Sequence, residues 1–365
     1  MPNRRAFIRN VAGATAGAFF LNRQFTAAAG GIQQAAAAGG RREIVIGGRR
    51  IKVVDIHTHH FIPEAVDVAT GTPLEAAAKG QARNTDRYLG PHWLQYMDEE
   101  GIDVMALNMN PWWYAADRDL SRRICAIQNE KTAEWCARYP DRFVGMATVA
   151  LQHPDLAAEQ LEEGVRQMGM RGAPIGGSVE GEELGSPRFD PFWAKVEELG
   201  VPLFMHPQGA PGTTQNDRLG GAGALGNTIG NPLETTVALS HMIFGGVFDR
   251  FPGLRVCAAH AGGYLPSYLG RSDVRCARSA GADCVEKSFA DYFRREILID
   301  TMIFREEGLR HLVAEVGVSQ MVYGTDYPFD WPVGIDFILN ASFLSDADKE
   351  AILGGNLVRL LRIDP

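Results

Sequence analysis

Two histidines, spaced two residues apart, end an apolar run in the stretch "VVDIHTHHF" from Val53 to Phe61. On a β-strand, side chains at i and i+2 point to the same side, so His57 and His59 would face one way. Paired imidazoles are common ligands of Zn²⁺ and related ions. The pair alone is a weak signal, since two histidines on a strand could also be ordinary hydrogen-bonded polar groups.

Three more polar side chains stand at the ends of later apolar runs: His206, His260 and Asp326. If these runs are parallel strands, all five groups converge at one edge of the sheet. Imidazoles with a carboxylate form a nitrogen and oxygen site suited to Zn²⁺, with Mn²⁺ or another divalent metal such as Fe²⁺ possible. A metal held there can keep a position open for water and lower the pKa of that water to about 7. The sequence therefore predicts a divalent metal site.

The elements that must position these groups follow a repeating pattern of a short apolar run, a polar loop and a longer helical segment. Eight such runs in one α/β chain favour a (β/α)8 TIM barrel. An open doubly wound sheet is the alternative, but no G-x-G-x-x-G follows the first run. The expected strands are 51–58, 103–109, 143–150, 170–175, 201–206, 254–260, 297–301 and 320–325. The expected helices are 119–138, 155–168, 189–199, 233–249 and 305–316.

Two connections exceed the usual length. Residues 60–90 show little pattern, and residues 207–232 are rich in glycine. The glycine-rich stretch is not a phosphate-binding loop, because it does not end in Gly-Lys-Ser/Thr. Long loops at the carboxyl ends of barrel strands build active sites, and we expect the glycine-rich stretch to form a lid or rim.

Composition excludes several classes of protein. The hydrophobic fraction of 45% is ample for a large core. The net charge is −8 and no basic stripe occurs, which argues against a nucleic-acid partner. The five cysteines form no C-x-x-C, so we expect free thiols, with Cys257 packed in the core.

The N-terminus has the features of a targeting segment. Arg4 and Arg5 precede a short apolar stretch diluted by Gly and Ala, and three alanines at 27–29 offer a cleavage site. This predicts a twin-arginine export signal over residues 1–29, a linker over 30–42 and a barrel over 43–363. The expected location is the periplasm, reached through the export machinery, or the cytoplasm if the signal is not used. The alternative is a plain N-terminal extension. The apolar stretch is too short for a stable membrane span.

Several motifs together resemble one enzyme family. They are "DIHTHHFIPE", "HPQG", "NPLETTVALSHMIFGGVFDRFPGLRVCAAHAGGYLP", "LGR" and "YGTDYPF", in this order over about residues 51–360. The chain resembles the metal-dependent amidohydrolase superfamily, in the branch that contains aminocarboxymuconate-semialdehyde decarboxylase.

The resemblance implies roles for the strand-end residues. His57, His59, His206 and Asp326 match the metal ligands, and Asp326 is therefore also part of the catalytic centre. His260 matches a histidine that acts in proton transfer.

The resemblance also implies how substrate is held. Arg271 matches an arginine that crosses a homodimer interface to bind a substrate carboxylate. A second arginine, from the same subunit, corresponds to Arg83 or Arg87. Trp112 is a further candidate for substrate binding, although it could only cap the barrel. One departure is Gln208, which stands where the family decarboxylase has tryptophan, and this puts the particular substrate in doubt.

The leading hypothesis is non-oxidative decarboxylation of an aromatic or unsaturated, muconate-type carboxylic acid. The same groups would serve hydrolysis of a lactone, ester or amide. A third class, an exported binding protein without turnover, keeps the fold but leaves His260 unexplained.

Overall fold

The structure is a computed structural model that describes residues 40–278, 284–285, 287–332 and 334–364. The predicted export signal and residues 30–39 of the predicted linker lie outside the described residues. Contacts group Gly40–Pro365 into one compact unit. Among the described helices, none combines the length and the apolar character needed to cross a bilayer.

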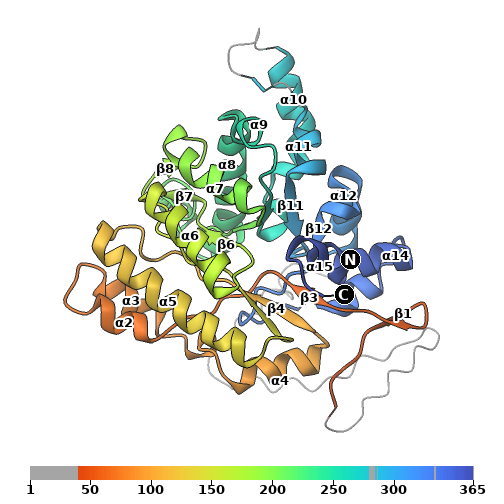
Figure 1. Ribbon diagram of the computed structural model, residues 1–365. Helices are drawn as coiled ribbons and strands as arrows, with labels where there is room; N and C mark the ends of the chain where they lie inside the picture. The colour runs from red at the N-terminus through yellow and green to blue at the C-terminus, as the bar shows by residue number, and fades with distance from the viewer. Residues whose placement is uncertain (1–39, 279–283, 286, 333, 365) are drawn as a thin grey trace, which may run out of the picture. The chain divides into compact units, whose positions relative to one another are not determined.

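In the described part of this unit, eight parallel strands form the centre, one inside each range expected from the sequence (Figure 1). Backbone hydrogen bonds join them into a three-stranded sheet, β3-β4-β5, and a five-stranded sheet, β6-β9-β10-β11-β12. The strands are β3 Val54–Asp55, β4 Val104–Leu107, β5 Phe143–Gly145, β6 Ala173–Ile175, β9 Leu203–Met205, β10 Val256–Ala258, β11 Ile297–Asp300 and β12 Met321–Val322.

Further backbone hydrogen bonds close the two sheets into one barrel. The N–H of Arg171 donates to the carbonyl of Gly145 at 2.8 Å, which joins the β5 side to the β6 side. On the other side, the N–H of Ile56 donates to the carbonyl of Tyr323 at 3.1 Å. The prediction of a (β/α)8 barrel is confirmed, and the carboxyl ends of the strands meet at one mouth.

Helices cover the outside of the barrel (Figure 1). The expected helical segments are found, except that the segment 233–249 is broken at Gly245–Gly246 into two helices, because Gly246 is left-handed with φ of 67°. Gly101, Gly169 and Gly200 end α4, α6 and α7 in the left-handed conformation that glycine adopts without steric cost. The principal helices are α4 Pro91–Glu100, α5 Arg118–Arg138, α6 Pro154–Met168, α7 Asp190–Leu199, α8 Asn231–Phe244, α10 Leu269–Ala277, α11 Phe289–Arg295 and α12 Glu306–Val316. The shorter ones are α9 Val247–Arg250, α13 Ile335–Leu339, α14 Asp346–Glu350 and α15 Asn356–Leu360.

The long first connection is more ordered than its sequence suggested. It contains α2 Glu64–Ala69 and α3 Glu75–Gln81. Alanine-rich turns favour a helix, but six or seven residues are too few to show a helical period. Small antiparallel hairpins also occur in the described chain: β1 Val45–Ile46 pairs with β2 Arg49–Arg50, and β7 Ser178–Val179 pairs with β8 Glu182–Glu183.

The core has two layers, as a closed barrel requires. The larger cluster lies between strands and helices and includes Trp93, Trp193 and Phe248. A separate, smaller cluster takes alternate residues from the barrel strands and adds leucines from the C-terminal segment around α15. Its buried members are Val54, Ile56, Val104, Ala106, Met146, Phe204, Cys257, Ala259, Leu298, Val322, Leu357 and Leu361. Cys257 is thus a core residue, as expected.

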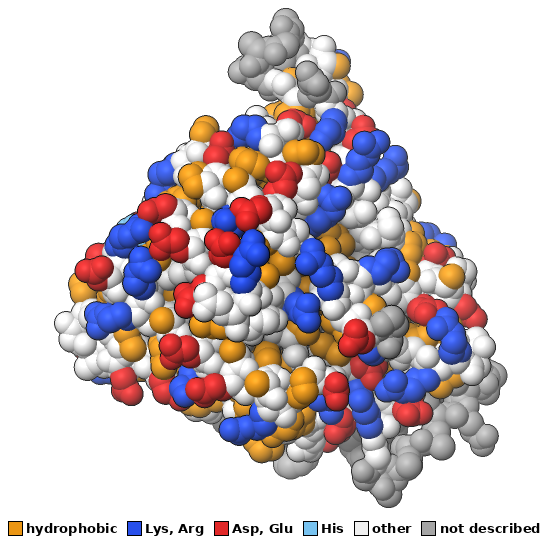
Figure 2. Space-filling view, in the orientation of Figure 1, with side chains coloured by type: hydrophobic (Ala, Val, Ile, Leu, Met, Phe, Trp, Pro, Cys, Tyr) orange, Lys and Arg blue, Asp and Glu red, His pale blue; other side chains and the backbone are white. Residues whose placement is uncertain are grey.

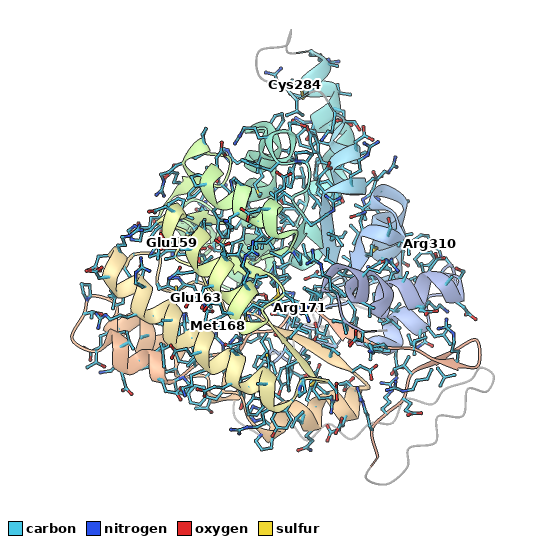
Figure 3. All side chains as sticks on the ribbon, viewed as in Figure 1. Glu159, Glu163, Met168, Arg171, Cys284 and Arg310 are labelled. Carbon is cyan, nitrogen blue, oxygen red and sulfur yellow. A yellow bond between two sulfur atoms is a disulfide. The ribbon has the colours of Figure 1, made fainter. Side chains whose placement is uncertain are left out.

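The prediction that the cysteines are free thiols is wrong for two of them. Cys276, near the end of α10, forms a disulfide with Cys284, and their Cα atoms are 5.2 Å apart (Figure 3). This separation is ordinary for a disulfide. Sequence spacing could not show the pairing, because it depends on how the chain turns back after α10. Cys125, Cys136 and Cys257 are free.

Candidate metal centre

Four of the strand-end side chains meet at the mouth of the barrel. His57, His59, His206 and Asp326 are all buried, and one potential ligand atom from each lies within 4.8 Å of the others. The Nε2 atoms of His57 and His59 are 3.1 Å apart. The ring centres of His59 and His206 are separated by 4.5 Å. Such a convergence of buried nitrogen and oxygen donors fits a divalent metal ion.

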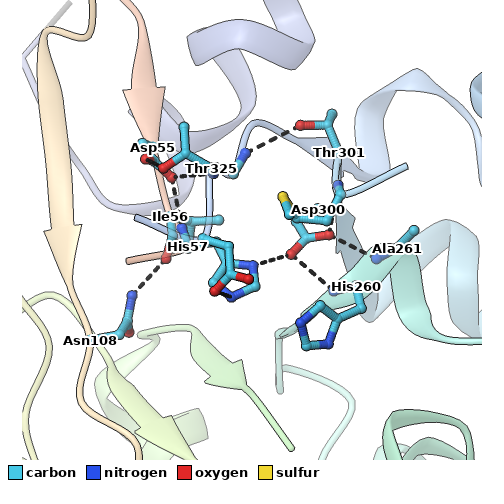
Figure 4. Close-up of polar contacts among 12 residues, drawn as sticks. Asp55, Ile56, His57, Asn108, His260, Ala261, Asp300, Thr301 and Thr325 are labelled. Atoms are coloured by element: carbon cyan, nitrogen blue, oxygen red, sulfur yellow. Dashed lines mark hydrogen bonds and ion pairs between the residues drawn. The ribbon is translucent and has the colours of Figure 1, made fainter. Parts of the chain in front are cut away.

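The first histidine is oriented by Asp300, the last residue of β11. Oδ2 of Asp300 lies 2.6 Å from Nδ1 of His57 (Figure 4). A proton shared at this contact leaves Nε2 of His57 free, facing His59 and Asp326. No motif in the sequence pointed to Asp300. The sequence showed only that Asp300 is an acidic residue at the end of an apolar run. Its histidine partner could not be recognised, because His57 lies 243 residues away along the chain.

Asp326 faces the histidines with one oxygen. Its Oδ1 is 2.7 Å from Nε2 of His59 and 3.1 Å from Nε2 of His57. Among the described residues this buried oxygen finds no hydrogen-bond donor. Its other oxygen, Oδ2, accepts a hydrogen bond from the indole N–H of Trp331 at 2.7 Å. A buried carboxylate oxygen without a hydrogen bond is costly, and a bound cation would satisfy it.

Burial and neighbouring charges set the protonation of these groups. Burial lowers the pKa of His59 to about 4 and holds that of His206 well below 6.5. Burial also acts to lower the pKa of His57, but Asp326 and Asp300 outweigh it and raise this pKa to about 10. His57 and His59 in turn keep the pKa of Asp326 well below its usual range, despite burial. Metal binding would replace the proton of His57, because a ligating imidazole must be neutral.

His260 lies beside the four groups but is held differently. Its ring centre is 4.9 Å from that of His206, and its buried Nδ1 has no hydrogen-bond partner within the described chain. Its backbone is left-handed, with φ of 54°, and its N–H donates to Oδ2 of Asp300 at 3.1 Å (Figure 4). Asp300 therefore anchors both His57 and His260. The role of His260 in proton transfer stays a prediction.

A second buried carboxylate fixes the strands beneath the site. Asp55 accepts hydrogen bonds from the N–H of His57 at 2.9 Å and from the hydroxyl of Thr325 at 2.5 Å. Asp55 lies on β3 and Thr325 follows β12, so these bonds tie together the two strand ends that carry His57 and Asp326 (Figure 4).

Of the two candidate arginines in the first connection, Arg87 rather than Arg83 is buried. Arg83 is exposed. The guanidinium of Arg87 donates to Oε1 of Gln81 at 2.6 Å and to the carbonyl of His60 at 3.4 Å. It also lies 5.7 Å from the ring centre of Phe61. Sequence position could not separate the two arginines, since burial depends on the packing of α3.

The other expected substrate residues differ in exposure. Trp112 is half-buried, lies 6.3 Å from Phe61 between ring centres, and donates to Oε1 of Gln128 at 3.2 Å. Arg271 is exposed on α10, which extends away from the barrel (Figure 1). Within this single chain, the structure does not bring Arg271 to the metal centre.

The glycine-rich connection is anchored by Glu234, which no sequence motif singled out. This residue lies in the first turn of α8 and is 2% exposed. Its carboxylate holds the start of the connection, just after His206. It accepts hydrogen bonds from the N–H groups of Gln208, Gly209 and Ala210 and from the hydroxyls of Thr213 and Thr214. The connection therefore begins as a fixed rim beside the metal centre.

Comparison with known proteins places this chain in a family. The Amidohydrolase family matches residues 54–363. The chain belongs to this family. The amidohydrolase is 32% identical over 329 residues to gamma-resorcylate decarboxylase of Rhodococcus jostii (strain RHA1), covering 85% of this chain and 98% of that protein. It is 31% identical over 279 residues to 2-amino-3-carboxymuconate-6-semialdehyde decarboxylase of Dictyostelium discoideum, covering 74% and 76%.

A solved structure shares the fold of this amidohydrolase. It is a dihydroxybenzoic acid decarboxylase of Polaromonas sp. JS666 with bound manganese and the inhibitor 2-nitroresorcinol. The TM-score is 0.74 at 27% identity, with 86% of this chain and 98% of that chain covered.

Proposed function

We propose that this amidohydrolase is a metal-dependent, non-oxidative decarboxylase of an aromatic carboxylic acid. The observation that carries the proposal is the buried group of His57, His59, His206 and Asp326, with His260 beside it. The relatives named above, which align with most of this chain, are decarboxylases of a resorcylate and a carboxymuconate semialdehyde. A muconate-type acid is therefore the second substrate class.

The reaction exchanges a carboxylate for a proton. A proton is added to the carbon that bears the carboxylate, the bond to the carboxylate breaks, and its electron pair returns to the substrate as CO₂ leaves. A bound divalent ion supplies Lewis-acid polarisation and local positive charge. His260 is positioned to deliver the proton, and Asp300 fixes its backbone. Arg87 is the proposed partner of the substrate carboxylate, because it is buried and its positive charge acts on His59 to lower the pKa of that imidazole.

A direct test measures CO₂ release from gamma-resorcylate and from 2-amino-3-carboxymuconate-6-semialdehyde. The metal-loaded chain should release CO₂ without any added redox cofactor, and the chelated chain should not. Hydrolysis is the rival reaction, and acid release from lactones, esters or amides without CO₂ would support it. Retention of an unchanged aromatic acid without either product would instead indicate a binding protein.

For the resident ion we propose Zn²⁺, with Mn²⁺ as the alternative. Three imidazoles and one carboxylate suit zinc, and one further position can remain for substrate. Manganese is supported by the Polaromonas structure, which contains it. Elemental analysis of chain purified without chelators should give about one divalent ion per chain.

We further propose that the active unit is a homodimer in which Arg271 enters the partner's pocket. Arg271 is exposed on α10, and its helix also exposes Val274, which is 53% accessible, while Tyr268 just before it is 56% accessible. Large apolar side chains beside an exposed arginine suit a protein interface. In Figure 2, acidic and basic side chains both occur across the face shown, so its surface is mixed in charge.

The final part of the proposal is export to the periplasm by the twin-arginine route. The paired arginines Arg4 and Arg5 motivate it. The disulfide between Cys276 and Cys284 is a second, independent support, because disulfides persist in oxidising compartments such as the periplasm. The location of a variant with lysine at both arginine positions tests this part.

A further inference from the structure

Trp331 forms a hydrogen bond with Asp326, one of the four residues of the candidate metal centre. Its indole N–H donates to Oδ2 of Asp326 at 2.7 Å, and its side chain is half-buried. The ring packs against Phe304, with 5.3 Å between ring centres and 45° between planes. The indole is therefore held from one side by an aromatic contact and from the other by a carboxylate.

This hydrogen bond makes the two oxygens of Asp326 unequal. Oδ2 is engaged by Trp331, whereas Oδ1 is buried, accepts no hydrogen bond from the described residues and lies 2.7 Å from Nε2 of His59. The backbone of Asp326 is also fixed, since its N–H donates to the carbonyl of His57 at 2.8 Å. The side chain can still rotate about its two torsions, and the hydrogen bond from the indole restrains where Oδ2 can lie.

We infer that Trp331 is a positioning residue that makes Asp326 a metal ligand through a single oxygen. A carboxylate can bind a metal through one oxygen or through both. A hydrogen bond to a charged oxygen is strong enough to keep Oδ2 turned away from the ion. The position that Oδ2 would otherwise take on a bound ion would then be available to substrate. The inference rests on the proposed role of Asp326 as a ligand.

The size of the expected effect follows from similar contacts elsewhere. Loss of a group that hydrogen-bonds a metal ligand typically weakens metal affinity about 10–100-fold. Trp331→Phe keeps an aromatic ring against Phe304 but removes the N–H. Trp112→Phe is the matched control, because Trp112 is also a half-buried tryptophan whose N–H is bonded, but to Gln128 rather than to a proposed ligand.

The experiment titrates Zn²⁺ into the metal-free chain in competition with a chelating dye. Zn²⁺ is the probe because such sites bind it more tightly than Mn²⁺, whichever ion is resident. Tryptophan emission is followed in the same titration. The melting temperature of each metal-free variant reports whether the fold is intact.

We expect Trp331→Phe to bind Zn²⁺ about 10–100-fold more weakly. Its metal-free melting temperature should match that of the unmodified chain. The Zn²⁺-dependent change in emission should shrink in Trp331→Phe and persist in Trp112→Phe, because only Trp331 bonds the carboxylate that would meet the ion. Equal Zn²⁺ affinity in the folded Trp331→Phe variant and the unmodified chain would overturn the inference. If Trp331→Phe does not fold, Trp331→Met is measured by the same criteria, since methionine fills irregular space.

The outcomes for the ligand role of Asp326 and for the positioning role of Trp331 can be told apart. An unmodified chain that binds no Zn²⁺ would refute the ligand role of Asp326 itself. An unmodified chain that binds Zn²⁺ while Trp331→Phe binds it equally well would refute only the positioning role of Trp331.

Discussion

Oδ2 of Asp300 lies 2.6 Å from Nδ1 of His57 and 3.1 Å from the backbone N–H of His260. One buried oxygen therefore orients a proposed metal ligand and the proposed proton-transfer residue together. The second oxygen of Asp300 accepts from the N–H of Ala261 at 2.8 Å, which completes the anchoring of the β10 end.

Replacing Asp300 should disturb both neighbours. Asp300→Asn keeps the shape of the side chain but leaves only one acceptor oxygen. The NH₂ group must therefore face either His57 or the N–H of Ala261, from which it cannot accept a hydrogen bond. We expect metal affinity or kcat/KM to fall about 10–100-fold, as for other groups behind metal ligands. Dye competition and CO₂ release measure the two quantities. Asp346→Asn, at an exposed position of α14, is a control with the same chemical change. A variant with unchanged affinity and unchanged rate would contradict the role given to Asp300.

His260 should be separable from the four proposed ligands. His260→Asn removes the imidazole but leaves His57, His59 and Asp326 intact. We expect the metal to be retained and the rate to fall about 10²–10⁴-fold, the usual contribution of general acid–base catalysis. Metal analysis and CO₂ release on the same preparation give both values. Loss of the metal from a folded His260→Asn variant would instead make His260 a ligand. The double variant His57→Ala/His59→Ala should lose the metal.

The sequence predicted the barrel and the polar strand ends because both are local patterns. Each strand is a short buried apolar run, and His206 or Asp326 follows its run closely. Asp300, Glu234 and the Cys276–Cys284 pair were missed for a common physical reason. Their roles depend on partners that only folding brings near: a distant histidine, the backbone of a glycine-rich connection, and a chain that turns back on itself.

Arg87 should bind the substrate carboxylate, whereas Arg83 should not. Arg87→Met is expected to raise KM about 10–100-fold, since a hydrogen bond to a charged group contributes about 1.5–3 kcal/mol. Arg83→Met, at an exposed position, should leave KM unchanged. Steady-state kinetics with an aromatic acid measure both.

The pKa of Arg87 predicts how its contribution to substrate binding depends on pH. Burial lowers the pKa of Arg87 to about 10, so its charge is lost only as pH rises through that value. The contribution of Arg87 to substrate binding should therefore be constant across the neutral range and weaken above about pH 10. A difference in KM between Arg87→Met and the unmodified chain that disappears within the neutral range would argue against a carboxylate contact.

Export can be tested through the signal and through the thiols. Arg4→Lys with Arg5→Lys should leave the chain in the cytoplasm, because the twin-arginine route depends on the arginine pair. In the periplasmic fraction of the unmodified chain, Cys276 and Cys284 should be protected from alkylation unless a reductant is added. Normal periplasmic delivery of the lysine variant would contradict the proposal. Alkylation of both thiols without reductant would remove the support that the disulfide gives.

The role proposed for Arg271 requires that the active protein be a homodimer. Arg271 is exposed on α10, and we propose that it serves the metal centre of a second copy. Arginine suits this task, because its planar fork binds a carboxylate at two points and stays charged. Arg271→Ala should therefore lose substrate binding while keeping its metal. Arg278→Ala, at the exposed end of the same helix, is the control and should remain active.

Mixing two inactive chains gives the decisive measurement. A dimer of one Arg271→Ala chain and one His260→Asn chain contains one pocket with an intact His260 and an intact Arg271 from the other subunit. Random exchange of equal amounts makes about half of all dimers mixed, each with one such pocket, so about one quarter of the unmodified activity should return. Exchange is checked by mass spectrometry of differently tagged chains. If mixed dimers form and no activity returns, the assignment of Arg271 to the partner's pocket is wrong.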